Sequence, residues 1–110
     1  MKLVEITDSQ PWEVFQSNQP WAQFPQSWAW GEFRISRGQT VKRVALVDDS
    51  GALLAAAQLE YRPKKVVGGY WFAPRGPVLS SHLSPDEQRN VFQAFVAQLK
   101  DLPLVRWMFL

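Results

Sequence analysis

The chain has 110 residues, 46% of them hydrophobic, so it is long enough for one domain with one core and too apolar for a disordered tail. It carries a net charge of only +2 and has no cysteine, which excludes a disulfide framework and a thiolate metal site. Residues 1–10 lack the apolar stretch of a signal peptide, and no apolar run approaches the roughly 20 residues of a membrane span. We therefore expect a cytoplasmic protein.

The first part of the chain predicts a strand and then a helix. A weak alternation over Leu3–Ile6 indicates the strand. Asp8 and Ser9 are helix-capping residues, and the helix that follows them should end near Ser17. The side chains expected on its buried face are Trp12, Val14 and Phe15. Two prolines between residues 18 and 25 then predict a loop.

The segment Phe24–Gly38 is the densest aromatic stretch of the chain and predicts a second helix. The hydroxyl of Ser27 can cap its beginning, and Gly38 can end it in the left-handed conformation that glycine adopts without strain. Three side chains fall on one helical stripe: Ala29, Trp30 and Phe33. We expect this stripe to pack over the small residues Ala55–Ala57 of a later strand.

The middle of the chain predicts antiparallel strands. Val41–Val47 and Ala52–Tyr61 are rich in β-forming residues and are separated by a turn sequence, Asp48–Gly51, which together indicate a hairpin. Tyr70–Ala73 predicts a third strand. It leads into the loop Pro74–Pro77, where two prolines should prevent a regular ladder.

The last part of the chain predicts a helix and a final strand. Ser84 and Glu87 have the spacing of a capping box, and the helix should run to about Lys100. Its apolar side chains at helical spacing are Phe92, Phe95, Val96 and Leu99. Leu104–Leu110 predicts the strand. The order β-α-α-β-β-β-α-β indicates an α+β domain over residues 1–110, with a mostly antiparallel sheet and flanking helices.

The sequence offers few residues for metal or nucleophilic catalysis. His82 is the only histidine, so neither a metal set nor a supported Ser-His-Asp triad can be assembled. Asp48 and Asp49 could form a carboxylate pair, but a hairpin turn explains them better. No Walker loop or G-x-G-x-x-G motif is present. We assign no catalytic residue, metal or cofactor from the sequence.

Basic residues near aromatic segments are the more informative group: Arg34, Arg37, Arg62, Lys64, Lys65 and Arg75. Arginine binds phosphate through two hydrogen bonds and stacks on aromatic rings, so an aromatic groove with these groups at its rim could hold a nucleotide or diphosphate. The alternative is a solvated basic surface above core aromatic residues, and the residues alone favour that alternative.

Three segments occur in an order that points to a known family. They are Q-S-W-A-W-G-E-F-R at Gln26–Arg34, the hairpin with V-D-D-S-G at Val47–Gly51, and A-P-R-G-P-V-L at Ala73–Leu79. Together they resemble the N-terminal part of the Fem family of peptidoglycan-bridge aminoacyltransferases. The resemblance extends over most of the chain, from about Ile6 to Met108.

The resemblance implies a partial acetyltransferase-like (GNAT-like) subdomain and a reaction class. Fem enzymes move an amino acid from aminoacyl-tRNA to a UDP-linked or lipid-linked muropeptide, without a metal or other cofactor. Arg34 matches the position where a basic residue of the family can contact the precursor's phosphates, and Arg75 is a second candidate in the R-G-P loop. Because family members contain a second such subdomain, we expect the 110-residue chain to be incomplete and inactive on its own.

Two other hypotheses stay open from the sequence. The chain could be a non-catalytic GNAT-like module that self-associates or completes a partner's sheet, because it ends within the apolar segment Leu104–Leu110. In the hypothesis of a Fem-like transferase, the chain is instead part of a longer enzyme. A nucleic-acid binder is a weaker alternative, since arginines and lysines lie beside aromatic residues but the charge is only +2.

Overall fold

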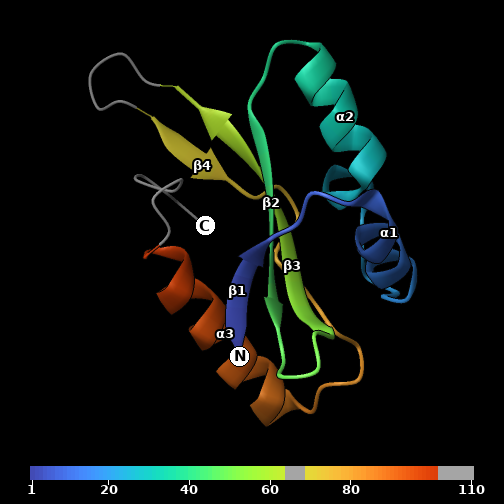
Figure 1. The fold of residues 1–110 in the computed structure, drawn as a ribbon, viewed down its shortest axis with the longest axis vertical. Coiled ribbons are helices and arrows are strands. Elements are labelled where there is room, and N and C mark those ends of the chain that lie inside the picture. The colour runs from blue at the N-terminus through green and yellow to red at the C-terminus, as the bar shows by residue number, and fades with distance from the viewer. Residues whose placement is uncertain (64–68, 102–110) are drawn as a thin grey trace.

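A five-stranded antiparallel sheet forms the centre of the molecule in the computed structural model, which describes residues 1–63 and 69–101 (Figure 1). The strands are β1 (Lys2–Glu5), β2 (Val41–Val47), β3 (Leu53–Arg62), β4 (Tyr70–Phe72) and β5 (Val78–Leu79). The sheet order is β1-β2-β3-β4. Strand β5 also pairs with β3, at Ala55 and Ala56. The predicted α+β class and the predicted hairpin of β2 and β3 are confirmed.

Helices cover both faces of this sheet (Figure 1). They are α1 (Ser9–Ser17), α2 (Trp28–Ser36) and α3 (Pro85–Leu99), and a short 3-10 turn, η1 (Phe24–Gln26), precedes α2. The predicted caps are confirmed: Asp8 accepts a hydrogen bond from the Gln10 amide at 3.0 Å, and the capping box of Ser84 and Glu87 is complete. Gly38 ends α2 with a φ of 84°.

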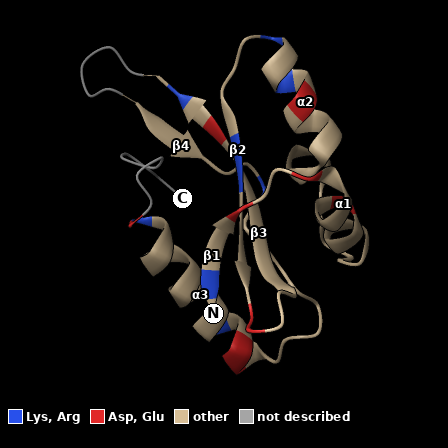
Figure 2. Cartoon of the chain, in the orientation of Figure 1, with Lys and Arg blue, Asp and Glu red and all other residues tan. Residues whose placement is uncertain are grey.

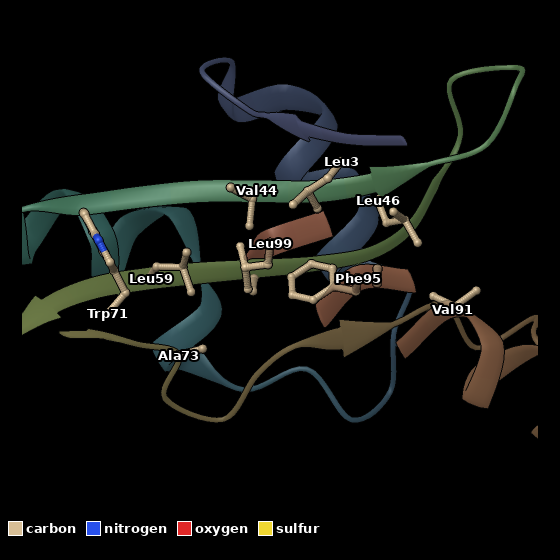
Figure 3. Packing of buried hydrophobic residues seen from close by; sticks show 11 residues of the cluster. Leu3, Val44, Leu46, Leu59, Trp71, Ala73, Val91, Phe95 and Leu99 are labelled. Carbon is tan, nitrogen blue, oxygen red and sulfur yellow. The ribbon is translucent and has the colours of Figure 1, made fainter. Parts of the chain in front are cut away.

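The larger core lies between the sheet and α3 (Figure 3). Val91, Phe95 and Leu99 of α3 are buried against strand residues such as Leu46 and Leu59. Burying one such side chain stabilises a fold by about 1.5–3 kcal/mol relative to leaving it exposed. A smaller cluster on the opposite face holds the following buried side chains: Trp12, Phe15, Ala45, Ala56 and Val78.

Several expected details differ in the structure. Val78–Leu79 forms the strand β5, which was not predicted, so the ladder on β3 resumes after the Pro74–Pro77 loop. Val14 is 54% exposed and Phe92 is 42% exposed, because α1 buries Trp12 and Phe15 alone and α3 buries the stripe of Val91, Phe95 and Leu99. The predicted strand Leu104–Leu110 lies outside the described residues.

The predicted orientation of α2 is wrong. Gly31 is its buried residue, whereas Ala29 and Phe33 are exposed and Trp30 is only partly covered. The physical reason is the close approach of the helix to polar side chains of the sheet. A Cβ atom at Gly31 would lie 2.2 Å from Gln58 Oε1 and 2.4 Å from Arg43 Nη2. The glycine therefore turns toward the sheet and the aromatic side chains turn away.

The outer edge of β1 is partly covered by α3. The Leu3 amide donates to Gln98 Oε1 at 2.8 Å, and Gln98 Nε2 donates to the Met1 carbonyl at 3.0 Å. Unpaired edge groups are the template for strand addition. The Gln98 side chain therefore occupies groups that a second strand would need at this edge.

Candidate functional site

Strand β3 has two different faces, and the polar one carries the candidate site. Ala55, Ala57 and Leu59 belong to the core beneath α3, while Ala56 belongs to the cluster beneath α1. Successive side chains of a strand point to opposite faces, so Gln58, Glu60 and Arg62 follow Ala56 on the second face. The face toward α2 therefore becomes polar and then charged toward the end of β3.

Glu60 is the centre of a charged cluster at this end. Its side chain is 3% exposed. Its carboxylate forms ion pairs with Arg34 Nη2 at 3.2 Å and with Arg62 Nη2 at 3.1 Å, and it accepts a hydrogen bond from Trp30 Nε1 at 3.2 Å. A buried carboxylate needs such partners, because an unpaired buried charge costs several kcal/mol. Two arginines share this one carboxylate, so the cluster keeps one uncompensated positive charge.

The two arginines retain unused hydrogen-bond donors. Both meet Glu60 on the same carboxylate oxygen, and the Nε atoms of Arg34 and Arg62 are buried without a hydrogen-bond partner among the described residues. A guanidinium can bind an oxyanion with two parallel hydrogen bonds. The cluster is therefore chemically suited to a phosphate or carboxylate group. Figure 2 shows the basic positions at the C-terminal end of α2 and at the end of β3.

Aromatic rings lie next to this cluster. The Arg34 guanidinium carbon is 5.8 Å from the Trp30 ring centroid, and that of Arg62 is 5.1 Å from the Phe72 centroid. Trp30 also contacts Phe24 and Phe33, with ring centroids 5.2 and 5.3 Å apart. The row of Phe24, Trp30 and Phe33 is thus an aromatic surface beside a cationic group.

A second polar network fixes α2 to the sheet and is structural. Arg43 is buried, stacks on the Trp28 ring at 3.5 Å and donates from Nε to Gln58 Oε1 at 2.8 Å. It also donates to the Trp28 carbonyl at 3.0 Å and forms an ion pair with Glu32 at 3.2 Å. Burial lowers the pKa of Arg43 from its ordinary value, and Glu32 opposes this shift.

Gln26 joins the aromatic helix to the proline-rich loop. On the edge of β3 that carries β4 and β5, no described strand residue pairs with Gln58, and the fully buried Gln26 side chain takes that place. Its Oε1 accepts from the Gln58 amide at 2.7 Å, and its Nε2 donates to the Gln58 carbonyl at 3.2 Å and to the Pro74 carbonyl at 2.6 Å. Gly76 lies against the same amide, where a Cβ would be 2.8 Å from the Gln26 Cδ.

The structure places Arg75 in this loop. Arg75 is exposed and has a φ of 59°, a left-handed conformation that costs a non-glycine residue energy and is enriched at functional sites. Its neighbours Pro74 and Gly76 contact Gln26, which precedes α2, whereas Arg34 lies in the last turn of α2. The described contacts therefore bring Arg34 together with Arg62, and they do not bring it together with Arg75.

Other candidates from the sequence do not form a catalytic group. Asp48 organises the hairpin turn by accepting from the Ser50 amide at 2.9 Å, the Ser50 hydroxyl at 2.7 Å and the Ala52 amide at 3.0 Å. Within residues 1–63 and 69–101, no three His, Asp or Glu side chains are grouped to hold a metal ion. None of the helices in that same part of the chain has the length and apolar character needed to cross a bilayer.

Comparison with known proteins identifies the relationship of this chain. The model of the FemAB family matches residues 7–103, which is most of the sequence. The chain belongs to the FemAB family. No curated protein matches it. The family match covers α1, the aromatic helix α2, the hairpin and the Arg75 loop together, so the resemblance predicted from those segments is confirmed.

Membership of the FemAB family relates the chain to peptidoglycan cross-bridge aminoacyltransferases. Sequence reasoning found Arg34 but missed Glu60 as its partner and treated Arg62 as one of several scattered basic residues. The signal was present in β3, because Gln58, Glu60 and Arg62 alternate with apolar residues in an otherwise apolar strand. Polar residues at every second position of a buried strand indicate a polar partner on that face.

Proposed function

We propose that this FemAB-family chain takes part in peptidoglycan cross-bridge formation, in the transfer of an amino acid from aminoacyl-tRNA to a muropeptide precursor. The observation that supports this proposal best is the family match over residues 7–103, together with a cationic cluster at Arg34 within the matched region. Since aminoacyl-tRNA is a cytoplasmic substrate, the proposal includes a cytoplasmic location. The fold is proposed to be a partial GNAT-like subdomain.

In this proposal the chain's own residues bind and orient the precursor. Arg34 contacts a phosphate of the UDP-linked or lipid-linked muropeptide, and Arg75 is a second phosphate contact presented by its loop. In the transfer itself, an amine of the precursor attacks the carbonyl carbon of the aminoacyl ester, the C–N bond forms, the C–O bond to the tRNA breaks, and the proton lost by the amine is balanced by protonation of the leaving ribose oxygen of the tRNA. Positioning of this kind supplies a large part of the rate of acyl transfer. No residue is proposed as the base.

Calorimetric titration with a UDP-linked muropeptide tests the proposal. Arg34→Ala removes a charge-assisted hydrogen bond of about 1.5–3 kcal/mol, so the affinity should fall roughly 10- to 100-fold. Arg89→Ala is the matched control, because Arg89 is an exposed arginine on α3 whose ion pair with Asp86 lies within that helix. Unchanged affinity in Arg34→Ala would refute the role of Arg34.

The Arg34 variant also removes one partner of the buried Glu60, so folding must be followed separately. Arg34→Lys keeps the positive charge but loses the planar fork of donors. We expect its affinity to lie between those of the wild type and Arg34→Ala. Thermal unfolding of all variants distinguishes lost binding from lost structure, because a binding effect persists when the variant is folded at the assay temperature.

A further inference from the structure

The C-terminal end of α2 and the end of β3 enclose a polar cleft that the proposed role of Arg34 does not use. Residues 37–40 and 61–63 line this cleft, whose volume is about 360 Å³. The Tyr61 amide donates to the Thr40 carbonyl at 2.9 Å, so the two walls are joined by a backbone hydrogen bond. None of the described residues that line the cleft is acidic.

Two arginines from different walls face this space as lining residues. Arg37 is exposed and forms no ion pair with any residue that the structure describes. Arg62 is held by Glu60 through Nη2, and its buried Nε has no hydrogen-bond partner in the part of the chain that the structure describes. Arg34 shares that Glu60 oxygen, so the carboxylate of Glu60 is already divided between Arg34 and Arg62, and the charge of Arg37 adds to their excess.

The C-terminal end of a helix normally carries partial negative charge, which would disfavour an anion at the end of α2. The loop that follows α2 compensates this charge. The amides of Arg37, Gly38 and Gln39 donate to carbonyls of the last turn, including Gly38 to Ile35 at 2.9 Å and Gln39 to Arg34 at 3.1 Å. Carbonyls that already accept hydrogen bonds in this way oppose an anion less than free ones.

We propose that this cleft is a phosphate-binding subsite, with Arg37 and Arg62 as its cationic partners and Glu60 as the residue that positions Arg62. Phosphate suits the site because two guanidinium groups on opposite walls can each donate to its oxygens. The class of ligand is therefore a phosphate or a phosphoester.

This inference rests on the proposed function only for the identity of the natural ligand, a second phosphate of the same precursor. The cleft itself can be tested with pyrophosphate by calorimetric titration of the 110-residue chain. Arg37→Gln and Arg62→Gln should each weaken pyrophosphate binding about tenfold or more, because each removes a charge-assisted hydrogen bond. Arg89→Gln, the control on α3, should bind like the wild type.

Arg37→Gln keeps the test valid if Arg62→Gln fails to fold, because the exposed Arg37 side chain has no ion pair to lose among the described residues. Uridine diphosphate and vesicles of phosphatidylglycerol present the same chemistry in soluble and lipid-bound form. We expect both arginine variants to weaken binding of uridine diphosphate. Binding confined to the vesicles would overturn the assignment of a cleft for a single soluble phosphoester.

Failure of this inference can be told from failure of the proposed function. Wild-type affinity for pyrophosphate in Arg37→Gln, or no pyrophosphate binding at all, would overturn the cleft whatever Arg34→Ala does to the muropeptide. Conversely, pyrophosphate binding that depends on both arginines supports the cleft even if the muropeptide does not bind.

Discussion

Replacing Gly31 by alanine is a stringent test of how α2 packs on the sheet. Gly31→Ala would normally stabilise a helix by about 0.5–1 kcal/mol, because glycine is the poorer helix former. Here the added Cβ would lie 2.2 Å from Gln58 Oε1 and 2.4 Å from Arg43 Nη2. Neither atom is free to move, since each belongs to the buried network of Arg43, Gln58 and Trp28.

The expected cost follows from the hydrogen bonds that must break. Moving Arg43 away from the new methyl group disrupts its bonds to Gln58 at 2.8 Å and to the Trp28 carbonyl at 3.0 Å. Each buried polar group left unpaired costs about 1–3 kcal/mol. After the gain in helix propensity is subtracted, we expect a net destabilisation of about 2–4 kcal/mol, which corresponds to a Tm lower by roughly 10–20 °C in a domain of this size.

Urea and thermal unfolding measure this effect, with Ala29→Gly as the control. Ala29 is an exposed residue of the same helix, so its replacement should cost only about 0.5–1 kcal/mol. In a double-mutant cycle, Gln58→Ala removes the nearest obstacle, and the two changes together should cost less than their sum. A Gly31→Ala protein as stable as the wild type, or more stable, would refute this packing.

Three further changes test other parts of the fold. Arg75→Gly should raise the free energy of unfolding by about 0.5–1 kcal/mol in urea, because glycine adopts the φ of 59° without strain; a loss of stability would show that the arginine side chain braces its loop. Gln26→Ala should lower that free energy by about 2–4 kcal/mol, since the buried amide and carbonyl of Gln58 lose their partner. The backbone and hydroxyl of Ser84 lower the pKa of Glu87, so its carboxylate stabilises the folded chain above the unfolded pKa, and this contribution is lost as the pH falls through the lower folded pKa. The Tm difference between wild type and Glu87→Gln should therefore be present at about pH 6 and vanish toward about pH 3, and a difference that is independent of pH would contradict it.

Local signals were sufficient for most of the secondary structure. The helix caps are Asp8, Ser27 and Ser84. Each accepts a hydrogen bond from an amide two or three residues later in the chain, so the cap does not depend on the rest of the fold. The hairpin of β2 and β3 follows in the same way from its turn, in which the Asp48 carboxylate accepts hydrogen bonds from nearby amides. These elements are therefore predictable from the sequence.

The orientation of α2 could not be read from such local signals. Hydrophobic periodicity favoured Ala29, Trp30 and Phe33 as the buried stripe, because it assumes that the facing surface is apolar. The facing surface is instead Arg43 and Gln58, and only Gly31 leaves room for them. The same long-range contact decides the site, because Glu60 meets Arg34 only after α2 has been placed with its glycine toward β3.

Two of the three sequence segments that carry the family resemblance are joined by one side chain. Gln26 begins the aromatic motif, Pro74 and Gly76 belong to the proline-rich one, and the Gln26 amide bonds the Pro74 carbonyl while it fills the gap in the ladder beside Gln58. Replacing Gln26 would therefore remove the hydrogen bond that joins the two motifs. This contact also sets the start of α2, and eight residues after Gln26 the helix presents Arg34 to Glu60. The two motifs thus fix the position of α2, and the polar face of β3 supplies Glu60 and Arg62, which then meet Arg34.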